Sequence, residues 1–487
     1  MTFERSDHLL VANTGGTQLV LDTRHGVPMV VHLGPPLSAA ELATWASTSV
    51  RPRPKNSLDV DAPPVLVPEQ GGGWQGHPGL LGRRHDGSGW APGFDLVDVS
   101  IGDGVARIAT RDDRAGLELA VEIELMPESS RLRVELTNVA LDRYDLDELT
   151  MTVPVPERAD ELAHFVGRWA HEFQLERVSW PEGAVSFDNR RGRTSHDRMP
   201  VLLAGTSGFD ENCGSVWGFA LGWSGNAVCG AELLTDGRRV VRVGELLAPG
   251  DVVLDSHETY TSPWIEIAAS ERGLNGVSQA LHASIRSHPV TPGVDRPRPV
   301  ILNTWEAVYF DHDLETLTAL ADRGARVGIE RFVLDDGWFH GRRSDDAGLG
   351  DWWIDQTVWP DGLHPLIDHV RGLGMEFGIW VEPEMVNPDS DLYRAHPEWA
   401  LGLDGYERVT GRQQLVLNLG RTDVFDYLVH QLEALFAGNE ISYVKWDMNR
   451  DLAQAADGRR AALHRHMHGV YALIDELRRR HPGVEIE

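Results

Sequence analysis

The stretch YVKWDMNR, residues 443–450, sets an acid directly after a lysine and a tryptophan, where the short apolar run ISYV ends. Such runs are typical of buried strands, and a strand that only fills a core has no use for a carboxylate. Asp447 is therefore either one half of a structural ion pair with Lys445 or a reactive group. The strand ends elsewhere in the chain favour the reactive group.

Strand and helix patterns alternate around this stretch. The strand patterns lie at 300–305, 331–338, 376–385, 414–420, 442–449 and 484–487. Between them apolar residues recur every three or four positions, as in HDLETLTALADRG (312–324), where we expect Gly324 to end a helix. Buried strands that alternate with helices are typical of parallel β/α units.

The strand ends distinguish two parallel folds. A Rossmann fold needs a glycine-rich turn after its first strand, but NTWEAVYFDHD (303–313) contains no glycine. Polar and aromatic residues instead gather at the carboxyl ends of several strands, where a (β/α)8 barrel builds its active site. These residues are Trp305, Asp335, Asp336, Trp380, Glu382, Glu384, Arg412, Lys445 and Asp447.

The first part of the chain has the period of antiparallel sheets. LELAVEIEL (117–125) alternates apolar and acidic residues, and RLRVELTNV (131–139) repeats the pattern. Similar runs lie near 147–155, 214–223 and 238–246, with one helical pattern near 38–47. We therefore expect a multidomain chain: a β-sandwich domain at 1–290, a linker at 291–298 and a TIM-type barrel domain at 299–487.

A segment rich in proline and glycine, residues 51–79, is too long for a simple hairpin. Long ordered loops often carry function, although this one is about equally consistent with a flexible excursion. Trp74, flanked by glycines, favours a contact role if its ring is exposed.

Composition excludes several classes of protein. The formal net charge is −29, which disfavours nucleic acids and anionic membrane surfaces because their phosphates would be repelled. We find no signal-peptide pattern and no apolar run long enough to span a membrane. Two cysteines indicate no disulfide framework, and we expect a cytoplasmic protein.

The strand-end residues suit a neutral polyol. Carboxylates accept hydrogen bonds from sugar hydroxyls, tryptophans cover the apolar ring face, and a carboxylate pair can cleave a glycosidic bond. Lys445 is two residues before Asp447, on the same face of the strand, so its charge would keep Asp447 ionised as a nucleophile.

Asp335 and Asp336 both reach one ligand only if the strand ends there. No His/Asp set completes a metal site around them, so vicinal hydroxyls are the expected ligand. A helix cap competes as the role of Asp336. His464 and His468, one helical turn apart, lack the HExxH arrangement and are expected to be surface or core residues.

Six motifs, in order, resemble glycoside hydrolase family 36, the bacterial α-galactosidases. They are NTWEA, LDDGWF, LGDWW, GIWVEPEMVN, GRQQLVLNLG and YVKWDMNR. FVGRWAHEFQ (165–174) resembles the family's N-terminal β-supersandwich domain, so the resemblance covers nearly the whole chain.

The resemblance implies a role for each site residue. Asp447 would be the nucleophile that forms a covalent galactosyl-enzyme, and Asp335 and Asp336 would hold the sugar's 4- and 6-hydroxyls. The substrate-binding residues that it implies are Asp335, Asp336, Arg412, Lys445, Asn449, Trp305 and Trp380. Family members need no metal or other cofactor. They are often homotetramers in which an N-terminal loop closes a neighbour's pocket, and 51–79 is the candidate for that loop.

The region 299–487 is shorter than the roughly 250 residues of a complete barrel. We count five strands and the start of a sixth, so we expect a barrel that is truncated near strand 6. By the resemblance, the acid/base aspartate would then lie beyond the end of this chain. Glu382, Glu384 and Asp351 are the nearby carboxylates considered as substitutes for it.

The function implied is a retaining α-galactosidase that hydrolyses terminal α-D-galactosyl residues of melibiose- or raffinose-type oligosaccharides. Three alternatives stay open: an inactive sugar-binding remnant, a galactosyl transferase of the raffinose-synthase type, and an α-N-acetylgalactosaminidase. The expected partners are a small α-galactoside and further copies of the chain.

Overall fold

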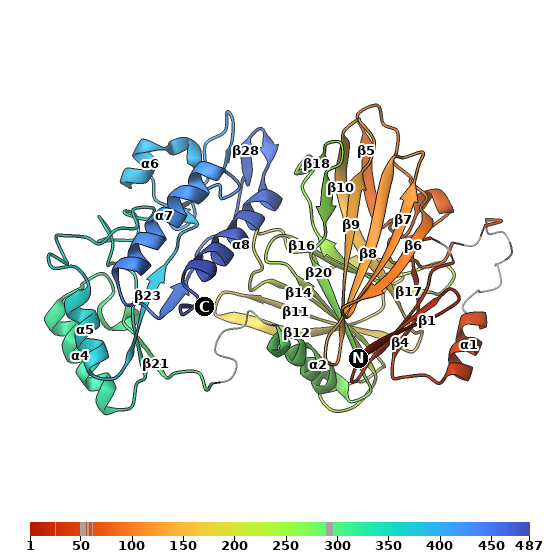
Figure 1. The fold of residues 1–487 in the computed structure, drawn as a ribbon, viewed down its shortest axis with the longest axis horizontal. Helices are drawn as coiled ribbons and strands as arrows, with labels where there is room; N and C mark the ends of the chain where they lie inside the picture. The colour runs from red at the N-terminus through yellow and green to blue at the C-terminus, as the bar shows by residue number, and fades with distance from the viewer. Residues whose placement is uncertain (25, 49–54, 56–57, 61, 289–295) are drawn as a thin grey trace. The chain divides into compact units, whose positions relative to one another are not determined.

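The computed structural model describes residues 1–487 except 25, 49–54, 56–57, 61 and 289–295. They form two compact units, Met1–Thr291 and Pro292–Glu487 (Figure 1). Most of the predicted linker, and residues 51–54, 56–57 and 61 of the predicted long loop, lie outside the described residues.

Antiparallel sheets dominate the N-terminal unit. The predicted strand at 117–125 is β8 (Leu117–Leu125), whose apolar side chains are mostly buried. On its other face Glu122 forms ion pairs with Arg107 and Arg133 across the neighbouring strands, at 2.7 and 2.6 Å. Apolar residues on one face and paired charges on the other hold such a strand in register.

The largest sheet has ten strands, including β19 (Thr259–Thr261), which pairs with β9. The other nine, in spatial order, are β12 (His171–Ser179), β11 (Glu161–Arg168), β14 (Arg198–Gly205), β15 (Val216–Gly222), β20 (Trp264–Ser270), β9 (Ser130–Asn138), β8, β7 (Val105–Asp112) and β6 (Asp95–Gly102).

Two smaller sheets complete this unit. The six-stranded sheet contains β13 (Gly183–Ser186), β16 (Ala227–Leu233), β17 (Arg239–Glu245), β10 (Tyr144–Val155), β18 (Val252–Leu254) and β5 (Leu80–Arg84). The four-stranded sheet contains β1 (Thr2–Ser6), β2 (Leu9–Asn13), β3 (Gln18–Asp22) and β4 (Met29–Gly34).

Among its described residues the unit also contains two helices and one short 3₁₀ turn, η1 (Gln70–Gly72). The helix predicted near 38–47 is confirmed as α1 (Ala39–Thr48). The prediction missed α2 (Gly273–Ser287), whose buried face includes Gly276, Ala280 and Ser284. Val277 and small residues on that face pack closely against the sheet, so few large apolar side chains mark the helix in the sequence.

The contact role suggested for Trp74 required an exposed ring, and the structure shows a buried one. Its side chain is 5% exposed, and its indole N–H donates to the His77 carbonyl over 2.9 Å. The Arg238 guanidinium lies over its ring, 5.3 Å from the centroid. The surrounding glycines thus let the backbone fold around a buried ring, rather than presenting that ring to a partner.

The C-terminal unit has a five-stranded parallel sheet. Its strands are β21 (Ile301–Asn303), β22 (Arg331–Leu334), β23 (Glu376–Val381), β27 (Tyr443–Trp446) and β30 (Glu485–Ile486). Their spatial order is their order along the chain, with every neighbouring pair parallel. A doubly wound sheet would reverse its strand order, whereas sequential parallel strands are the arrangement of a TIM-type barrel.

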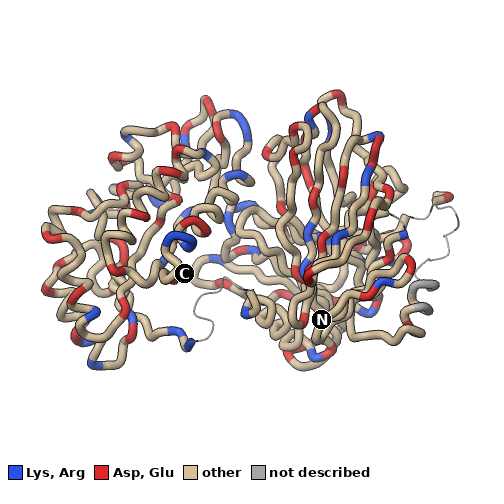
Figure 2. The backbone as a smooth tube through the Cα atoms, in the orientation of Figure 1, with Lys and Arg blue, Asp and Glu red and all other residues tan. Residues whose placement is uncertain are grey.

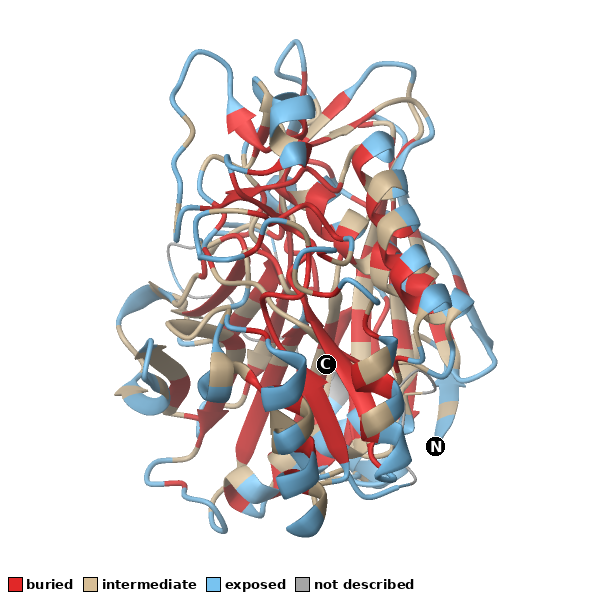
Figure 3. Cartoon of the chain, turned by 90° about the vertical axis from the view of Figure 1, so that its left-hand side faces the viewer, coloured by how far each residue is buried: buried red, intermediate tan, exposed pale blue. Residues whose placement is uncertain are grey.

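Helices connect these strands. They are α3 (Trp305–Val308), α4 (Leu314–Arg326), α5 (His364–Gly372), α6 (Asp391–Ala395), α7 (Thr422–Gly438) and α8 (Leu463–Arg480), with the 3₁₀ turn η2 (Pro397–Trp399). Figure 3 shows buried strands and helices whose outward sides are exposed. Gly324 does not end α4 as predicted; it lies buried inside the helix, and Gly328, with φ of 89°, follows its end.

The prediction that QLVLNLG (414–420) is a strand of the parallel sheet is wrong. Its Leu415 and Val416 form β26, which pairs antiparallel with β24 (Met385–Val386). A short buried apolar run has the same pattern in a parallel sheet and in a small antiparallel pair, so its period could not assign it to one of them. A small three-stranded sheet contains β25 (Gly402–Leu403), β28 (Ala456–Gly458) and β29 (Arg460–Ala461).

A buried ion network lies at the amino ends of the parallel strands. Arg331 is 1% exposed, and its guanidinium pairs with Glu376 at 2.6 Å and Glu485 at 2.9 Å. It also lies over the Tyr443 ring, 4.3 Å from the centroid. Arg298 forms a further ion pair with Glu485. One buried cation therefore joins β22, β23, β27 and β30.

Acidic and basic positions are interspersed along both units (Figure 2). This distribution spreads the net charge of −29 over the surface and places it in no single tail. None of the helices in the described part of the chain is both long and apolar enough to cross a membrane.

Candidate active site

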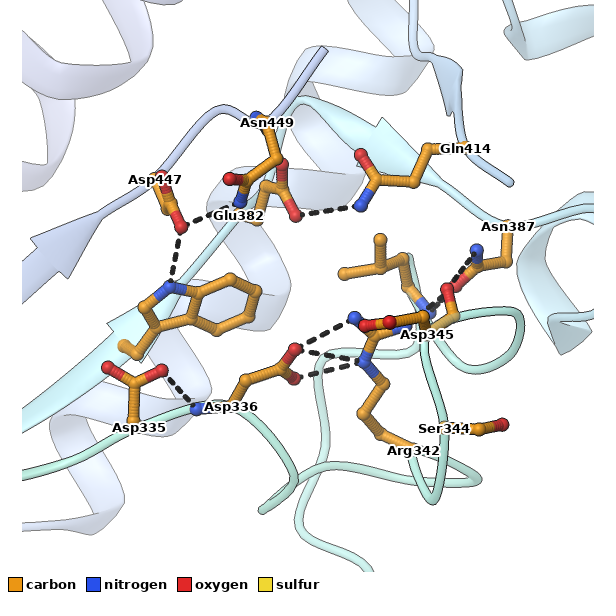
Figure 4. A network of polar contacts seen from close by, with 12 residues as sticks. Asp335, Asp336, Arg342, Ser344, Asp345, Glu382, Asn387, Gln414, Asp447 and Asn449 are labelled. Atoms are coloured by element: carbon orange, nitrogen blue, oxygen red, sulfur yellow. Dashed lines mark hydrogen bonds and ion pairs between the residues drawn. The ribbon is translucent and has the colours of Figure 1, made fainter. Parts of the chain in front are cut away.

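Acidic and amide side chains follow three adjacent strands of the parallel sheet (Figure 4). Asp335 and Asp336 follow β22, Glu382 follows β23, and Asp447 and Asn449 follow β27. Because β22, β23 and β27 run parallel, their carboxyl ends meet at one edge and bring these side chains together.

Asp447 is half-buried and its carboxylate is held by three N–H donors. Its Oδ2 accepts from the Trp380 indole at 3.0 Å and from the Asn449 side-chain amide at 2.7 Å. Its Oδ1 accepts from the Met448 backbone at 2.8 Å. Asp447 donates its own backbone N–H to the Val381 carbonyl, so β23 and β27 together fix the orientation of this carboxylate.

The predicted pairing of Lys445 with Asp447 is corrected by the structure. The Lys445 ammonium lies 2.8 Å from Asp335 Oδ2, which also accepts from the Asn303 amide at 2.5 Å. The strand ends at Trp446, so Asp447 no longer follows the alternation that would place it beside Lys445. Lys445 instead supplies the counter-charge for Asp335.

Asp336 is buried against the Arg342 guanidinium. Two parallel hydrogen bonds join them, Nε to Oδ1 at 2.9 Å and Nη2 to Oδ2 at 2.8 Å. Burial raises the pKa of Asp336, and the hydrogen bonds and charge of Arg342 oppose that rise. Asp336 caps no helix, because the next described helix after it begins only at His364.

Glu382 lies 1% exposed beneath Asp447 and Asn449. Its Oε1 accepts from the Asn449 backbone N–H at 2.6 Å, and its Oε2 accepts from the Gln414 amide at 3.2 Å. Burial, with the nearby Asp447 carboxylate, raises the pKa of Glu382 to about 8. Glu382 is therefore a neutral acid near pH 7, unlike an ordinary glutamate.

Aromatic rings form one side of the cluster. Trp380 is buried and stacks with Phe339 at a centroid distance of 6.3 Å, and its carbonyl accepts from the Trp338 indole at 2.9 Å. Trp305 is half-buried at the start of α3, edge-on to Phe310. Its backbone N–H donates to Asn303, which in turn binds Asp335.

Arg412 is exposed and lies in a strained two-residue turn. Gly411 and Gln414 exchange backbone hydrogen bonds across it, and Arg412 and Gln413 have φ of 51° and 61°. Side chains larger than glycine are disfavoured in that left-handed region. In the described part of the chain, the side chain that reaches the cluster from this turn is Gln414 and not Arg412.

Comparison with known proteins identifies the family. A model of the glycosyl hydrolase family 36 N-terminal domain matches residues 26–255, and the Melibiase model matches 259–487. The structure of the GH36 α-galactosidase AgaB from Geobacillus stearothermophilus superposes with a TM-score of 0.91 at 30% identity, covering 100% of this chain and 72% of that one. The chain belongs to glycoside hydrolase family 36.

Other members of glycoside hydrolase family 36 are similarly close. An α-galactosidase from Escherichia coli is 45% identical over 438 residues, which is 90% of this chain and 62% of the relative. A variant of AgaA from Geobacillus stearothermophilus, in complex with raffinose, superposes with a TM-score of 0.91 at 30% identity, covering 98% of this chain and 71% of that one. The chain thus spans less than two thirds of the length of its Escherichia coli relative.

These matches confirm the predicted β-sandwich followed by a TIM-barrel-type domain. They also place the strand-end cluster in a family 36 fold, where the roles of its individual residues remain predictions.

Two of the carboxylates considered as substitutes for an acid/base group have structural contacts instead. Asp351 accepts the backbone N–H groups of Asp391 and Leu392 at the start of α6, at 2.8 and 2.9 Å. Glu384, fully buried, accepts from the Trp446 indole at 3.1 Å.

Sequence reasoning missed several residues of this family 36 site. Asn303 binds Asp335, Arg342 binds Asp336, and Gln414 binds Glu382. Arg342 also donates to the side chain of Asn387 over 3.2 Å. Asn303 ends β21, and Asn387 and Gln414 lie in the quoted motifs GIWVEPEMVN and GRQQLVLNLG, although the motifs alone gave these residues no role. Arg342 lies outside the quoted motifs, on a loop whose course the period of the sequence does not determine.

Proposed function

We propose that this chain carries the galactosyl site and nucleophile of a retaining α-galactosidase that acts on terminal α-D-galactosyl residues of oligosaccharides. The observation that carries the proposal is the half-buried Asp447, oriented by Trp380 and Asn449 at the carboxyl end of a parallel sheet. Relatives named α-galactosidase, one of them solved with raffinose, support the substrate class.

In the proposed reaction, Asp447 attacks the anomeric carbon as the bond to the leaving oxygen breaks and a proton passes to that oxygen. Water then displaces the carboxylate, which restores Asp447 and releases galactose. Two donors on Asp447 Oδ2 limit rotation of the carboxylate, and a fixed attacking oxygen is what a near-attack geometry requires.

Sugar recognition would come from the neighbouring strand ends. The Asp335–Lys445 pair offers an acceptor and a donor side by side, which suits adjacent hydroxyls of one sugar. Asp336 follows Asp335 directly at the same strand end, and Arg342 holds its carboxylate. We propose Trp305, Trp380 and Asn449 as the further sugar contacts, and Arg412 from its exposed turn.

A retaining mechanism needs a second carboxyl group roughly 5–5.5 Å from the nucleophile. We propose no described residue for that role. The expectation that an aspartate outside these 487 residues supplies it stays a prediction, as do homotetramer assembly and a cytoplasmic location.

Hydrolysis of p-nitrophenyl α-galactoside tests the proposal, because its leaving group needs little acid assistance. We expect release of p-nitrophenol by the chain and its loss in Asp447→Asn, by about 10³-fold or more as for removal of a nucleophile. Asp451→Asn, which makes the same charge change at an exposed position four residues on, is the matched control.

No release by folded wild-type chain contradicts the proposed hydrolysis. Equal loss in both variants would mean that the charge change, and not the attacking group, matters. A preference for p-nitrophenyl α-N-acetylgalactosaminide would identify the activity as that of an α-N-acetylgalactosaminidase. Transfer to an added sugar in place of hydrolysis would assign a transferase.

A further inference from the structure

We propose that Glu382 is a positioning residue for the nucleophile: by binding the Asn449 backbone, it aims the Asn449 side chain at Asp447. The inference rests on the proposed function, since it explains how the attacking carboxylate is kept in place. Glu382 itself is buried and hydrogen-bonded on both oxygens, so it acts through its neighbours and does not touch a substrate.

The contacts run in sequence from one strand to the next. Glu382 Oε1 accepts the Asn449 N–H at 2.6 Å, and the Asn449 amide donates to Asp447 Oδ2 at 2.7 Å. Two residues before Glu382, Trp380 donates to the same oxygen at 3.0 Å. The end of β23 therefore holds Asp447 from two directions, directly through an indole and indirectly through Glu382 (Figure 4).

The charged groups that act on Glu382 are the Asp447 and Asp336 carboxylates and the Arg342 guanidinium, and its other contacts are the neutral amides of Gln414 and Asn449. Burial and the Asp447 charge raise the pKa of Glu382 to about 8. Below that pH the neutral acid binds Asn449 without placing a second anion beside Asp447. Above it, two carboxylates repel each other in a poorly solvated site.

A buried oxygen next to Glu382 fits a protonated acid. Gln414 is 2% exposed, and its Oε1 has no hydrogen-bond partner in the described part of the chain. A half-turn of the Gln414 amide would place this oxygen against Glu382 Oε2 as the acceptor for the acid's O–H. The same amide would then serve both protonation states.

Two substitutions separate positioning from packing. Glu382→Gln keeps an oxygen for the Asn449 N–H and stays neutral at every pH, so it copies the protonated acid. Glu382→Leu has a similar volume but leaves that N–H without a partner. A small displacement of an attacking group can cost about 10²-fold in rate, and we expect Glu382→Leu to slow attack by roughly 10–100-fold at pH 6.

The reaction measured is covalent labelling by 5-fluoro-α-galactosyl fluoride, followed by intact mass. The Asp447 carboxylate forms a bond to the anomeric carbon while the carbon–fluorine bond breaks, and fluoride leaves as the anion without needing a proton. We expect Glu382→Gln to label at nearly the wild-type rate at pH 6 and faster than wild type above pH 8, where only wild type gains the second anion. Glu398→Gln, an exposed change of the same kind, should match wild type at both pH values.

Each outcome is decisive. A wild-type chain that folds but is not labelled overturns the proposed function and this inference with it. Labelled wild type with an equally fast Glu382→Leu overturns the positioning role alone. Glu382→Gln as slow as Glu382→Leu at pH 6 also overturns it, because the retained oxygen would then be irrelevant. If Glu382→Leu does not fold, equal pH profiles of Glu382→Gln and wild type overturn the inference.

Discussion

The buried ion pair between Asp336 and Arg342 shows how much stability can depend on a single residue. The Asp336 carboxylate is held by two hydrogen bonds from Arg342, itself 2% exposed. Removing one partner of a buried pair leaves an uncompensated charge, which costs roughly 3–5 kcal/mol. We therefore expect Arg342→Met to lower the free energy of unfolding by about that amount at pH 7, as measured by urea denaturation.

The loss of stability in Arg342→Met should depend on pH. Burial already raises the pKa of Asp336, and loss of the guanidinium raises it further. A carboxyl whose folded-state pKa is raised gives its full stability at low pH and loses it as pH rises, so the deficit of Arg342→Met should shrink toward pH 4.5. The double variant with Asp336→Asn should recover part of the loss at pH 7; no recovery would show that the arginine acts through packing.

Some residues of the site were predictable because they sit at strand ends. Asp335, Asp336 and Asp447 come where apolar runs end, so the end of each run located them, whereas Asn449 was expected from the family motif YVKWDMNR. Their partners were not predictable in the same way. Lys445 was expected beside Asp447, but the strand stops at Trp446 and its ammonium meets Asp335 on another strand. Which side chains pair depends on the residue at which each strand ends, and the hydrophobic period alone predicts that residue poorly.

At the scale of elements, the turn at Arg412 and Gln413 is held in an unfavourable conformation. The Asn387 amide donates to the Gln413 carbonyl at 3.0 Å, and Arg450 donates to the Gln414 carbonyl at 2.6 Å. These bonds use backbone oxygens, so they persist whatever side chain position 413 carries. The buried amide and guanidinium therefore keep the backbone in the left-handed region.

We expect Gln413→Gly to raise the free energy of unfolding by about 1 kcal/mol, because glycine adopts a φ of 61° without strain. Differential scanning calorimetry would record a higher Tm. Gln413→Ala is the control, since alanine loses the side chain but keeps the strain. A gain in alanine equal to that in glycine would assign the effect to the lost glutamine and not to the backbone.

Elements with a strong period were predictable and elements without one were not. β8 matches its predicted range because its apolar residues alternate over many positions. The helix α2 was missed because small residues fill its buried face. The run at 414–420 was assigned to the wrong sheet because its pairing partner, β24, comes from a loop. Short or small-residue elements take their form from tertiary contacts.

At the scale of the molecule, one buried arginine ties together strands that are distant in sequence. Arg331 on β22 contacts Glu376 on β23, Tyr443 on β27 and Glu485 on β30. We expect Arg331→Met to lower the free energy of unfolding by roughly 1–3 kcal/mol, because Glu376 and Glu485 lose their buried partner but keep the exposed Arg296 and Arg298. In this variant, hydrogen exchange should show β30 opening first. Only two of its residues pair with β27, so its attachment to the sheet depends on the ion network.

Arg296→Met is the matched control for this prediction. Arg296 contacts the same two glutamates from an exposed position, where water screens an ion pair and leaves it little effect on stability. Equal losses in the two variants would mean that burial of Arg331 adds nothing. Uniform exchange throughout the sheet would show that the network is not specific to β30.

Trp380, Val381 and Glu382 are consecutive residues of one strand end, and they contact Asp447 and Asn449 on the strand beside it. The surroundings of the proposed nucleophile thus lie on a single pair of neighbouring strands. Loops that make no contact with this pair can lengthen, shorten or change sequence without disturbing it, whereas the loop that carries Gln414 is bound to Glu382. Descendants of such a chain can acquire new sugar preferences while the carboxylate keeps its orientation, so specificity can evolve separately from reactivity.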